Sequence, residues 1–223
     1  MSTLQTLDRG LRALDIISRS PAGITVADLA KELGIARAIS YRIVATLESH
    51  SLVVRADDGR IRLGAGAAVL ASRFVPQFQH AAGPVLHDLA ERTQATAFVS
   101  AAQGDECIVI LVAEPEGALL HVGYRVGNRH PLDRGAAGIA ILALRPEDAR
   151  DPEAVKQARA LGYSVTRGQL ERGAVGVAAG VRAPRGAGLE CSVGVVAIAG
   201  LDVDAAALAV VDAAARLSAL LTD

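Results

Sequence analysis

Apolar residues recur every three to four positions in successive segments of the first fifty residues, which is the spacing of helices that bury one face. The first helix is predicted from Thr6, and its buried face comprises Leu7, Leu11, Leu14 and Ile17. Pro21 and Gly23 interrupt the pattern, so we expect the helix to end shortly before them.

A second, shorter helix carries a capping signal at its start. Thr25 and Asp28 form a T-x-x-D arrangement, in which a threonine side chain caps the helix and the acid favours its positive end. Gly34 ends this helix after little more than two turns, and a third helix is predicted at 37–50. A short helix, a glycine turn and a following helix are the elements of a helix-turn-helix.

The third helix has an outward face of small, basic and aromatic residues, which are Ala38, Tyr41, Arg42 and Ala45. Its predicted inward residues are Ile39, Ser40, Ile43, Val44 and Leu47. Bulky outward groups would keep the backbone away from base edges, so this slim cationic face favours insertion into the major groove of duplex DNA. The predicted DNA-binding residues are Thr25, Arg37, Ala38, Ile39, Tyr41, Arg42 and Thr46, together with Arg60 from the next segment.

Residues 52–55 and 60–63 alternate apolar and basic side chains around Asp57-Asp58-Gly59, which predicts a hairpin, the wing of a winged helix-turn-helix. From its exposed side Arg55, Arg60 and Arg62 could reach phosphates, which would steepen the salt dependence of binding without adding base specificity. The alternative is a three-helix bundle whose arginines only solvate its surface.

A linker helix is predicted after the hairpin, at 67–76, with a short apolar stripe of Val69, Leu70 and Phe74. The stripe is too small to fold alone, so we expect it to pack on its counterpart in another subunit of a homo-oligomer, a dimer or a dimer of dimers. Packing on the second domain of its own chain is the alternative. The predicted domains are the winged helix-turn-helix at 4–66, the linker helix at 67–76 and a second domain at 77–223.

The second domain mixes helices with apolar strand runs. Strands are expected at 96–102, 107–113, 119–124, 175–182 and 191–199, and helices at 80–92, 136–144, 152–161 and 203–221. This order predicts an α+β fold with an antiparallel sheet.

Charge divides the chain in the same way. The net charge of -1 argues against a protein that coats nucleic acid through bulk electrostatics. Residues 1–73, however, carry ten basic and seven acidic side chains, a net +3, and the remainder thirteen and seventeen, a net -4. Two domains with different partners are therefore expected. A content of 51% hydrophobic and 21% charged residues excludes a disordered, collagenous or coiled-coil chain.

The sequence carries no catalytic or metal-binding signature. It lacks GxSxG, HExxH and GxxxxGK[ST], and its five histidines have no metal-ligand spacing. Cys107 and Cys191 lie in apolar strand runs, where buried, inert thiols are the default. We therefore predict no catalytic residue, cofactor, metal or disulfide. The lack of an export signal or a long apolar span favours a cytoplasmic protein without a membrane partner.

Residues 23–64, GITVADLAKELGIARAISYRIVATLESHSLVVRADDGRIRLG, resemble the IclR family of bacterial transcriptional regulators, and the resemblance extends over nearly the whole chain. It implies that the second domain is similar to a GAF-type sensor, a six-stranded sheet flanked by helices that binds a small molecule and controls the DNA-binding half. It implies that the protein represses a neighbouring operon, and activation is the alternative. Ala38-Ile39-Ser40 departs from the S-T-V usual in the family, so the operator sequence cannot be carried over.

A candidate effector site lies in residues 127–138, where a loop leads into a helix whose first turn is nearly free of side chains. Its N–H groups suit a carboxylate, although the small residues could merely allow the helix to pack on the sheet. This stretch is similar to the family pattern G-x-R-x-P-L-H-A-T-A-x-G-K, from which Asp133 and Ile139 depart. The predicted effector-binding residues are Leu132, Arg134, Ala136, Ala137, Gly138, Thr166, Gly176, Ala197 and Ala199.

The resemblance also indicates the kind of effector. It implies that relatives fix small polar acids with hydroxyl groups and an acid, at positions that hold Thr166, Gly176, Ala197 and Ala199 in this chain. A pocket without these anchors is expected to take a larger or more apolar effector, an aromatic or acyl carboxylic acid. The alternative is a regulator with a degenerate sensor domain that binds no small ligand.

Overall fold

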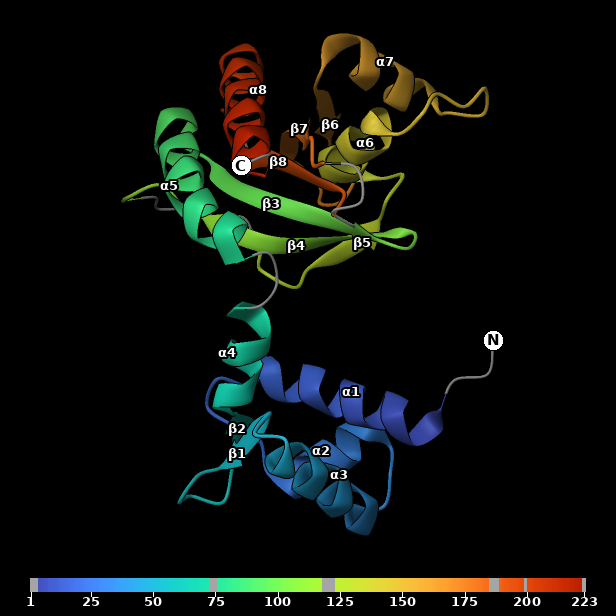
Figure 1. Cartoon of the computed structure of the whole chain (residues 1–223), viewed down its shortest axis with the longest axis vertical. Helices are drawn as coiled ribbons and strands as arrows, with labels where there is room; N and C mark the ends of the chain where they lie inside the picture. Colours follow the sequence, from blue (N-terminus) through green and yellow to red (C-terminus); the bar gives the residue numbers. More distant parts are fainter. Residues whose placement is uncertain (1–3, 73–75, 118–122, 185–188, 199, 222–223) are drawn as a thin grey trace. The chain divides into compact units, whose positions relative to one another are not determined.

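The structure, a computed structural model, describes residues 4–72, 76–117, 123–184, 189–198 and 200–221, with the backbone alone at 76–81. Its contacts divide into two compact units, residues 1–76 and 77–223 (Figure 1). Each unit has its own hydrophobic core. The predicted α+β class is confirmed, with helices and a hairpin in the first unit and an antiparallel sheet in the second.

The first unit has the element order of a winged helix-turn-helix. Its elements are α1 (Gln5–Ser18), α2 (Val26–Leu33), α3 (Arg37–Ser49), β1 (Val53–Arg55), β2 (Ile61–Leu63) and α4 (Ala65–Ser72). Thr25 caps α2 as predicted, and Gly34 ends it in the left-handed conformation, with φ of 64°. Gly59 adopts φ of 74° in the turn of the hairpin, which explains a glycine at that position.

The buried face predicted for α1 is wrong over the first half of the helix. Leu7 and Leu11 are 59% and 60% exposed, whereas Ala13 and Ile17 are buried in the core and Leu14 packs against it, partly buried. The helix contacts α2, α3 and β2, but these elements leave its first turns uncovered, so the apolar periodicity continues past the core that α1 can cover. An exposed leucine face on α1 results.

Two glycines join the wing to α4. A Cβ atom on Gly64 would lie 2.3 Å from the carbonyl oxygen of Ser51, and one on Gly66 would lie 2.8 Å from the same oxygen. The N–H of Gly66 donates to this oxygen at 2.9 Å, which fixes the start of the helix. The linker helix therefore begins at Ala65, two residues before the predicted position, and Phe74 lies outside the described residues.

The second unit is built on one six-stranded sheet with the strand order β5-β4-β3-β8-β7-β6, and every neighbouring pair is antiparallel (Figure 1). Its strands are β3 (Thr96–Gln103), β4 (Glu106–Ala113), β5 (Arg129–Pro131), β6 (Ser164–Arg167), β7 (Val175–Val181) and β8 (Cys191–Ala197). Its helices are α5 (Pro76–Thr93), α6 (Gly135–Leu144), α7 (Glu153–Leu161) and α8 (Val203–Leu220).

Helices cover the sheet on both sides. Ala178 of β7 belongs to the same core cluster as Ala136 and Ile141 of α6, so α6 lies on that face. The neighbouring residues Val177 and Ala179 point to the opposite face, where α8 contacts β7. Ion pairs between α5 and α8, including Arg92 with Asp212 at 2.9 Å, hold these two helices together.

The strand predictions fail at the short or irregular strands. Of the strand expected at 119–124, residues 119–122 lie outside the described part of the chain, and Gly123 and Tyr124 are not in a strand. The strands β5 and β6 were not predicted because three or four residues are too few to show alternation. The strand expected at 191–199 ends at Ala197, and Ala199 is outside the described residues.

Candidate functional site

The exposed face of α3 carries an aromatic ring between two guanidinium groups. The Arg37 guanidinium donates to the Tyr41 hydroxyl at 3.3 Å, and its carbon lies 5.6 Å from the centre of the Tyr41 ring. From β1, the Arg55 guanidinium lies 5.9 Å from the same centre, and its Nε is 3.7 Å from the Glu48 carboxylate. These cation–π contacts fix the orientation of the Tyr41 side chain between α3 and the wing.

Arg42, one residue further along α3, has a different environment. It is exposed, and its side chain makes no hydrogen bond or ion pair with any described residue. Ala38 and Ala45 beside it are exposed and small, and Ile39 is 37% exposed, at the edge of the core rather than inside it. Within the described residues, this surface offers an unpaired cation flanked by two small side chains.

One buried or capping hydroxyl group acts at each helix of the helix-turn-helix: Thr25 caps α2, and Ser40 joins α3 to α2. Thr25 accepts from the Asp28 N–H at 3.1 Å and donates to the Asp28 carboxylate at 2.6 Å, so its hydroxyl is already engaged in the cap. Ser40 is fully buried, where an aliphatic residue is usual in the family, and donates to the Val26 carbonyl at 3.3 Å. A buried hydroxyl requires such a partner.

Two wing arginines bind the chain itself. Arg60 donates to the Gly23 carbonyl at 3.0 Å, and Arg62 donates to the Ala22 carbonyl at 3.1 Å and to the Asp58 carboxylate at 2.9 Å. The Arg60 backbone N–H also donates to Asp58, and this bond, aided by Arg62, lowers the pKa of the Asp58 carboxyl. Both side chains therefore tie the wing to the segment before α2, a role the sequence did not predict.

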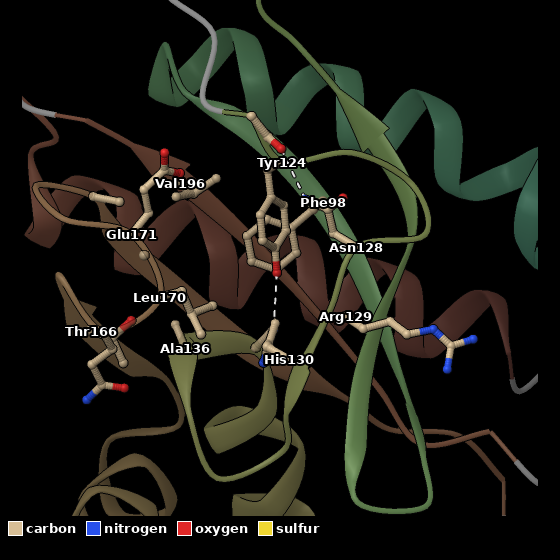
Figure 2. A pocket seen from close by; sticks show the side chains of 15 residues that line it. Phe98, Tyr124, Asn128, Arg129, His130, Ala136, Thr166, Leu170, Glu171 and Val196 are labelled. Atoms are coloured by element: carbon tan, nitrogen blue, oxygen red, sulfur yellow. Dashed lines mark hydrogen bonds between the residues drawn. The ribbon is translucent and has the colours of Figure 1, made fainter. Parts of the chain in front are cut away.

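The second unit contains a pocket of about 430 Å³ between the start of α6, the sheet and two loops. Figure 2 shows its lining. Four predicted effector-binding residues line it, which are Ala136, Ala137, Thr166 and Gly176. Four others do not, which are Leu132, Arg134, Gly138 and Ala197, and Ala199 is outside the described residues.

The residues that miss the pocket have packing or tethering roles. A Cβ atom on Gly138 would lie 2.1 Å from the Leu132 carbonyl oxygen, so Gly138 allows α6 to pack against the preceding loop. Arg134 donates to the Gln169 carbonyl at 2.7 Å, and the Gln169 side-chain oxygen accepts from the Gly135 N–H at 3.0 Å. The sequence predicted that N–H groups at the start of this helix bind a carboxylate. The first of them, that of Gly135, is instead bound by Gln169.

Eleven lining residues were not among the predicted effector-binding residues, although three of them, Asn128, Arg129 and His130, lie in the stretch 127–138 that the sequence singled out. The additional residues are Phe98, Gly123, Tyr124, Asn128, Arg129, His130, Gln169, Leu170, Glu171, Ala174 and Val196. Phe98 and Val196 lie on adjacent strands β3 and β8, so only the strand pairing brings them together. Residues 169–171 follow β6, and the unpredicted pairing of β6 with β7 brings them to α6.

An aromatic pair and a histidine form one wall of the pocket. The rings of Phe98 and Tyr124 are 4.8 Å apart at their centres and inclined by 55°. The His130 Nδ1 is 3.0 Å from the Pro131 carbonyl and must donate to it, so Nε2 accepts from the Tyr124 hydroxyl at 3.3 Å. In Figure 2 the Tyr124 hydroxyl points toward His130, and a dashed line marks this bond. Burial raises the pKa of the Tyr124 phenol, which therefore keeps its proton.

The thiols offer no reactive group. Both cysteines are fully buried, and burial raises the pKa of the Cys107 thiol to about 11 and that of Cys191 to about 12. Within the described ranges, no three His, Cys, Asp or Glu side chains gather into a group that could hold a metal ion. No helix in the described part of the chain is long and apolar enough to cross a membrane.

Curated proteins similar to this chain are transcriptional regulators. Transcriptional repressor IclR of Escherichia coli is 24% identical over 149 residues, 65% of this chain and 54% of that protein. HTH-type transcriptional regulator Rv1719 of Mycobacterium tuberculosis is 31% identical over 159 residues, 71% of this chain and 58% of that protein. The matched part thus spans little more than half the length of these relatives.

Solved structures share the fold over almost the whole chain. The IclR transcriptional regulator of Alicyclobacillus acidocaldarius has a TM-score of 0.78 at 24% identity, covering 98% of this chain and 99% of that one. An IclR homologue of Microbacterium hydrocarbonoxydans, solved in complex with 4-hydroxybenzoate, has a TM-score of 0.80 at 19% identity, covering 97% and 99%.

Two sequence models of one family match this chain. The IclR helix-turn-helix domain matches residues 6–57, and the C-terminal domain of the bacterial transcriptional regulator IclR matches residues 76–152. These matches cover α1 to β1 in the first unit and α5 to α6 in the second, including Arg42 and the start of α6. The chain belongs to the IclR family of bacterial transcriptional regulators.

Proposed function

We propose that this chain binds operator DNA through α3 and the wing, represses transcription there, and responds to a small aromatic effector bound in the pocket of its second unit. The observation that carries the proposal is the exposed face of α3, where Arg42 is free beside two alanines and Arg37 and Tyr41 stand next to it. An exposed cation without an intramolecular partner can bind a base edge or a phosphate at no cost in broken ion pairs.

The roles of the basic residues differ in this proposal. Arg42 and Ile39 contact base edges from α3, and Arg37 and Arg55 keep Tyr41 positioned at the edge of the helix. Arg60 and Arg62 orient the wing through the Gly23 and Ala22 carbonyls, and their charges attract phosphates. The Thr25 hydroxyl is bound to Asp28, and the Thr46 hydroxyl donates to the Arg42 carbonyl. These two residues therefore contribute to DNA binding by positioning the backbone of α2 and α3.

A second copy of the chain is the partner that this unit requires. Five exposed apolar residues lie on this small unit, which are Leu4 just before α1, Leu7 and Leu11 on α1, and Val69 and Leu70 on α4. Burial of such faces against another copy would form a dimer, in which two recognition helices reach half-sites about 34 Å apart. Pairing of dimers into a tetramer is the larger assembly in the same proposal.

The pocket is the effector site in this proposal. Its volume of about 430 Å³ suits a ligand with one aromatic ring, and Phe98 and Tyr124 provide an aromatic wall. The complex of the Microbacterium hydrocarbonoxydans homologue with 4-hydroxybenzoate supports an aromatic effector, and the aromatic acid predicted from the sequence is the first compound to test. A coupling of about 1 to 3 kcal/mol would change operator affinity about 5- to 150-fold.

The experiment that tests DNA binding is selection from a random duplex library with the full chain. We expect recovery of a two-fold symmetric sequence with half-sites about ten base pairs apart. Absence of enrichment at moderate salt would refute operator recognition. In vitro transcription from a promoter carrying the selected site then distinguishes repression from activation, because repression lowers the transcript yield and activation raises it.

The experiment that tests the effector is a thermal-shift screen with aromatic compounds. A ligand at about 100 times its dissociation constant adds roughly 2.7 kcal/mol to the stability of the unit that binds it. If no compound raises the melting temperature, the result favours the degenerate sensor, a regulator that acts without a small ligand.

A further inference from the structure

We propose that the pocket selects an uncharged, hydroxylated aromatic ligand and discriminates against the corresponding carboxylate. This inference rests on the proposed function of the second unit as an aromatic sensor and names the chemistry of its effector. It differs from the acid expected from the sequence, and the reason lies in the charges and hydrogen bonds of the lining.

The arginine of the lining, Arg129, and the arginine that precedes α6, Arg134, are already paired. The Arg129 guanidinium, which belongs to the lining, donates to the Glu106 carboxylate at 3.0 Å. Arg134 is outside the lining and donates to the Gln169 carbonyl at 2.7 Å. A ligand carboxylate would therefore find no free guanidinium among the described lining residues, and Lys does not occur in that lining.

The N-terminus of α6 is partly occupied as well. The Gln169 side-chain oxygen accepts from the Gly135 N–H at 3.0 Å, and Gln169 also lines the pocket. The next N–H groups of the first turn belong to Ala136 and Ala137, and they are neutral donors. One neutral donor satisfies a hydroxyl oxygen, whereas a carboxylate withdrawn from water needs several donors or a counter-charge.

Glu171 adds a negative charge to the lining. It is exposed, and its carboxylate has no partner among the described residues, so its charge is not neutralised there. At a separation of about 6 Å in water, two like charges repel enough to weaken binding about three-fold. An uncharged ligand avoids this repulsion.

The lining also contains hydroxyl groups that suit a neutral polar ligand. Thr166 is 8% exposed and lines the pocket, and its hydroxyl makes no hydrogen bond within the described structure. The Tyr124 hydroxyl donates to His130, so its oxygen keeps a lone pair that can accept from a ligand hydroxyl. Together with the rings of Phe98 and Tyr124 in the same lining, these groups fit an aromatic alcohol or a phenol (Figure 2).

Calorimetry at pH 7.5 with the full chain and two ligands of equal ring size tests this inference. We expect 4-hydroxybenzyl alcohol to bind at least about ten-fold more tightly than 4-hydroxybenzoate. The reason is that the lining offers hydrogen-bond partners to a ligand hydroxyl but no unpaired cation to a ligand carboxylate. Glu171→Gln should raise the affinity for the acid about three-fold and leave that for the alcohol within two-fold. Glu147→Gln is the matched control, since Glu147 is exposed and outside the lining.

Thr166→Val gives an independent measurement because it keeps the shape and removes the hydroxyl. The affinity for the alcohol should fall about five- to ten-fold. Tighter binding of the acid than of the alcohol would overturn the inference and leave the sensor function standing. If neither compound nor any other aromatic ligand binds, the effector part of the proposed function fails too, and operator selection still tests DNA binding separately.

Discussion

Ser192 of β8 lies directly opposite Ser100 of β3, and the sheet buries both hydroxyl groups completely. The Ser192 Oγ has no hydrogen-bond partner among the described residues. The Ser100 Oγ is near the Tyr124 hydroxyl and the Cys107 thiol, but neither is in hydrogen-bond geometry. An unsatisfied buried hydroxyl costs about 1 to 3 kcal/mol, so this pair weakens the sheet on the face that carries Phe98.

Ser192→Ala should therefore stabilise the second unit. Removal of the unpaired hydroxyl is expected to raise the free energy of unfolding in urea by about 1 kcal/mol. Ser164→Ala is the matched control, because the Ser164 hydroxyl donates to the Ala136 carbonyl at 2.6 Å and its loss should lower stability by about 1 kcal/mol. A destabilised Ser192→Ala variant would indicate that a water molecule or another partner satisfies this hydroxyl.

Gly138→Ala should destabilise the second unit by about 2 to 3 kcal/mol. The added methyl would lie 2.1 Å from the Leu132 carbonyl oxygen, so either α6 or the loop before it must move. Gly10→Ala on α1 is the control, since its methyl would meet nothing within 4 Å and alanine favours the helix by about 0.5 to 1 kcal/mol. Equal stability of both variants, measured by urea denaturation, would contradict the close packing of α6.

Arg42→Ala should remove sequence discrimination while the protein remains folded. Its side chain has no partner in the described chain, so truncation costs no internal contact, whereas loss of a base contact costs about 1 to 3 kcal/mol. We expect the affinity ratio between the selected operator and a scrambled duplex to fall about 10- to 100-fold. Arg19→Ala, which removes an exposed ion pair with Asp15 on α1, should leave the ratio unchanged. An unchanged ratio for Arg42→Ala would exclude a base-reading role.

Arg60→Ala should weaken binding to every DNA duplex by about the same factor, whatever its sequence. The Arg60 guanidinium binds the Gly23 carbonyl at 3.0 Å, so its loss frees the wing and is expected to lower the free energy of unfolding by about 1 kcal/mol. Loss of a charge near phosphates should also reduce the salt dependence of binding by about one unit of slope. Titrations at several salt concentrations check this, and a loss confined to one operator sequence would instead make Arg60 a base contact.

The sequence predicted the elements whose signals are local. The cap at Thr25, the end of α2 at Gly34 and the hairpin turn at Gly59 depend on a few neighbouring residues, and all three are confirmed. The leucine face of α1 was assigned to the core because periodicity shows which residues share a face, but not whether another element covers it. For Leu7 and Leu11 no element of the described chain does.

The pocket was less predictable because its lining depends on long-range pairing. Thr166 and Gly176 were found through the family resemblance, and the β6–β7 register now places them opposite each other. Gln169 and Leu170 gave no signal, since their position near α6 follows from that hairpin. Arg134 illustrates the limit, because its type suited an anion while its actual partner, the Gln169 carbonyl, is 35 residues away.

The burial of Cys107 predicts a loss of stability at high pH. In the unfolded chain the thiol loses its proton from about pH 8.5, whereas in the folded unit burial raises its pKa to about 11. The stabilisation is therefore fully present below about pH 8.5 and is lost as the pH rises toward 11, by at most about 1.4 kcal/mol per pH unit. Urea denaturation from pH 8 to 11 should show a steeper decline for the native chain than for Cys107→Ala, in which every other titrating group remains. Parallel curves would mean that the thiol is reached by water, and in that case it should also react with a thiol reagent at pH 8 without unfolding.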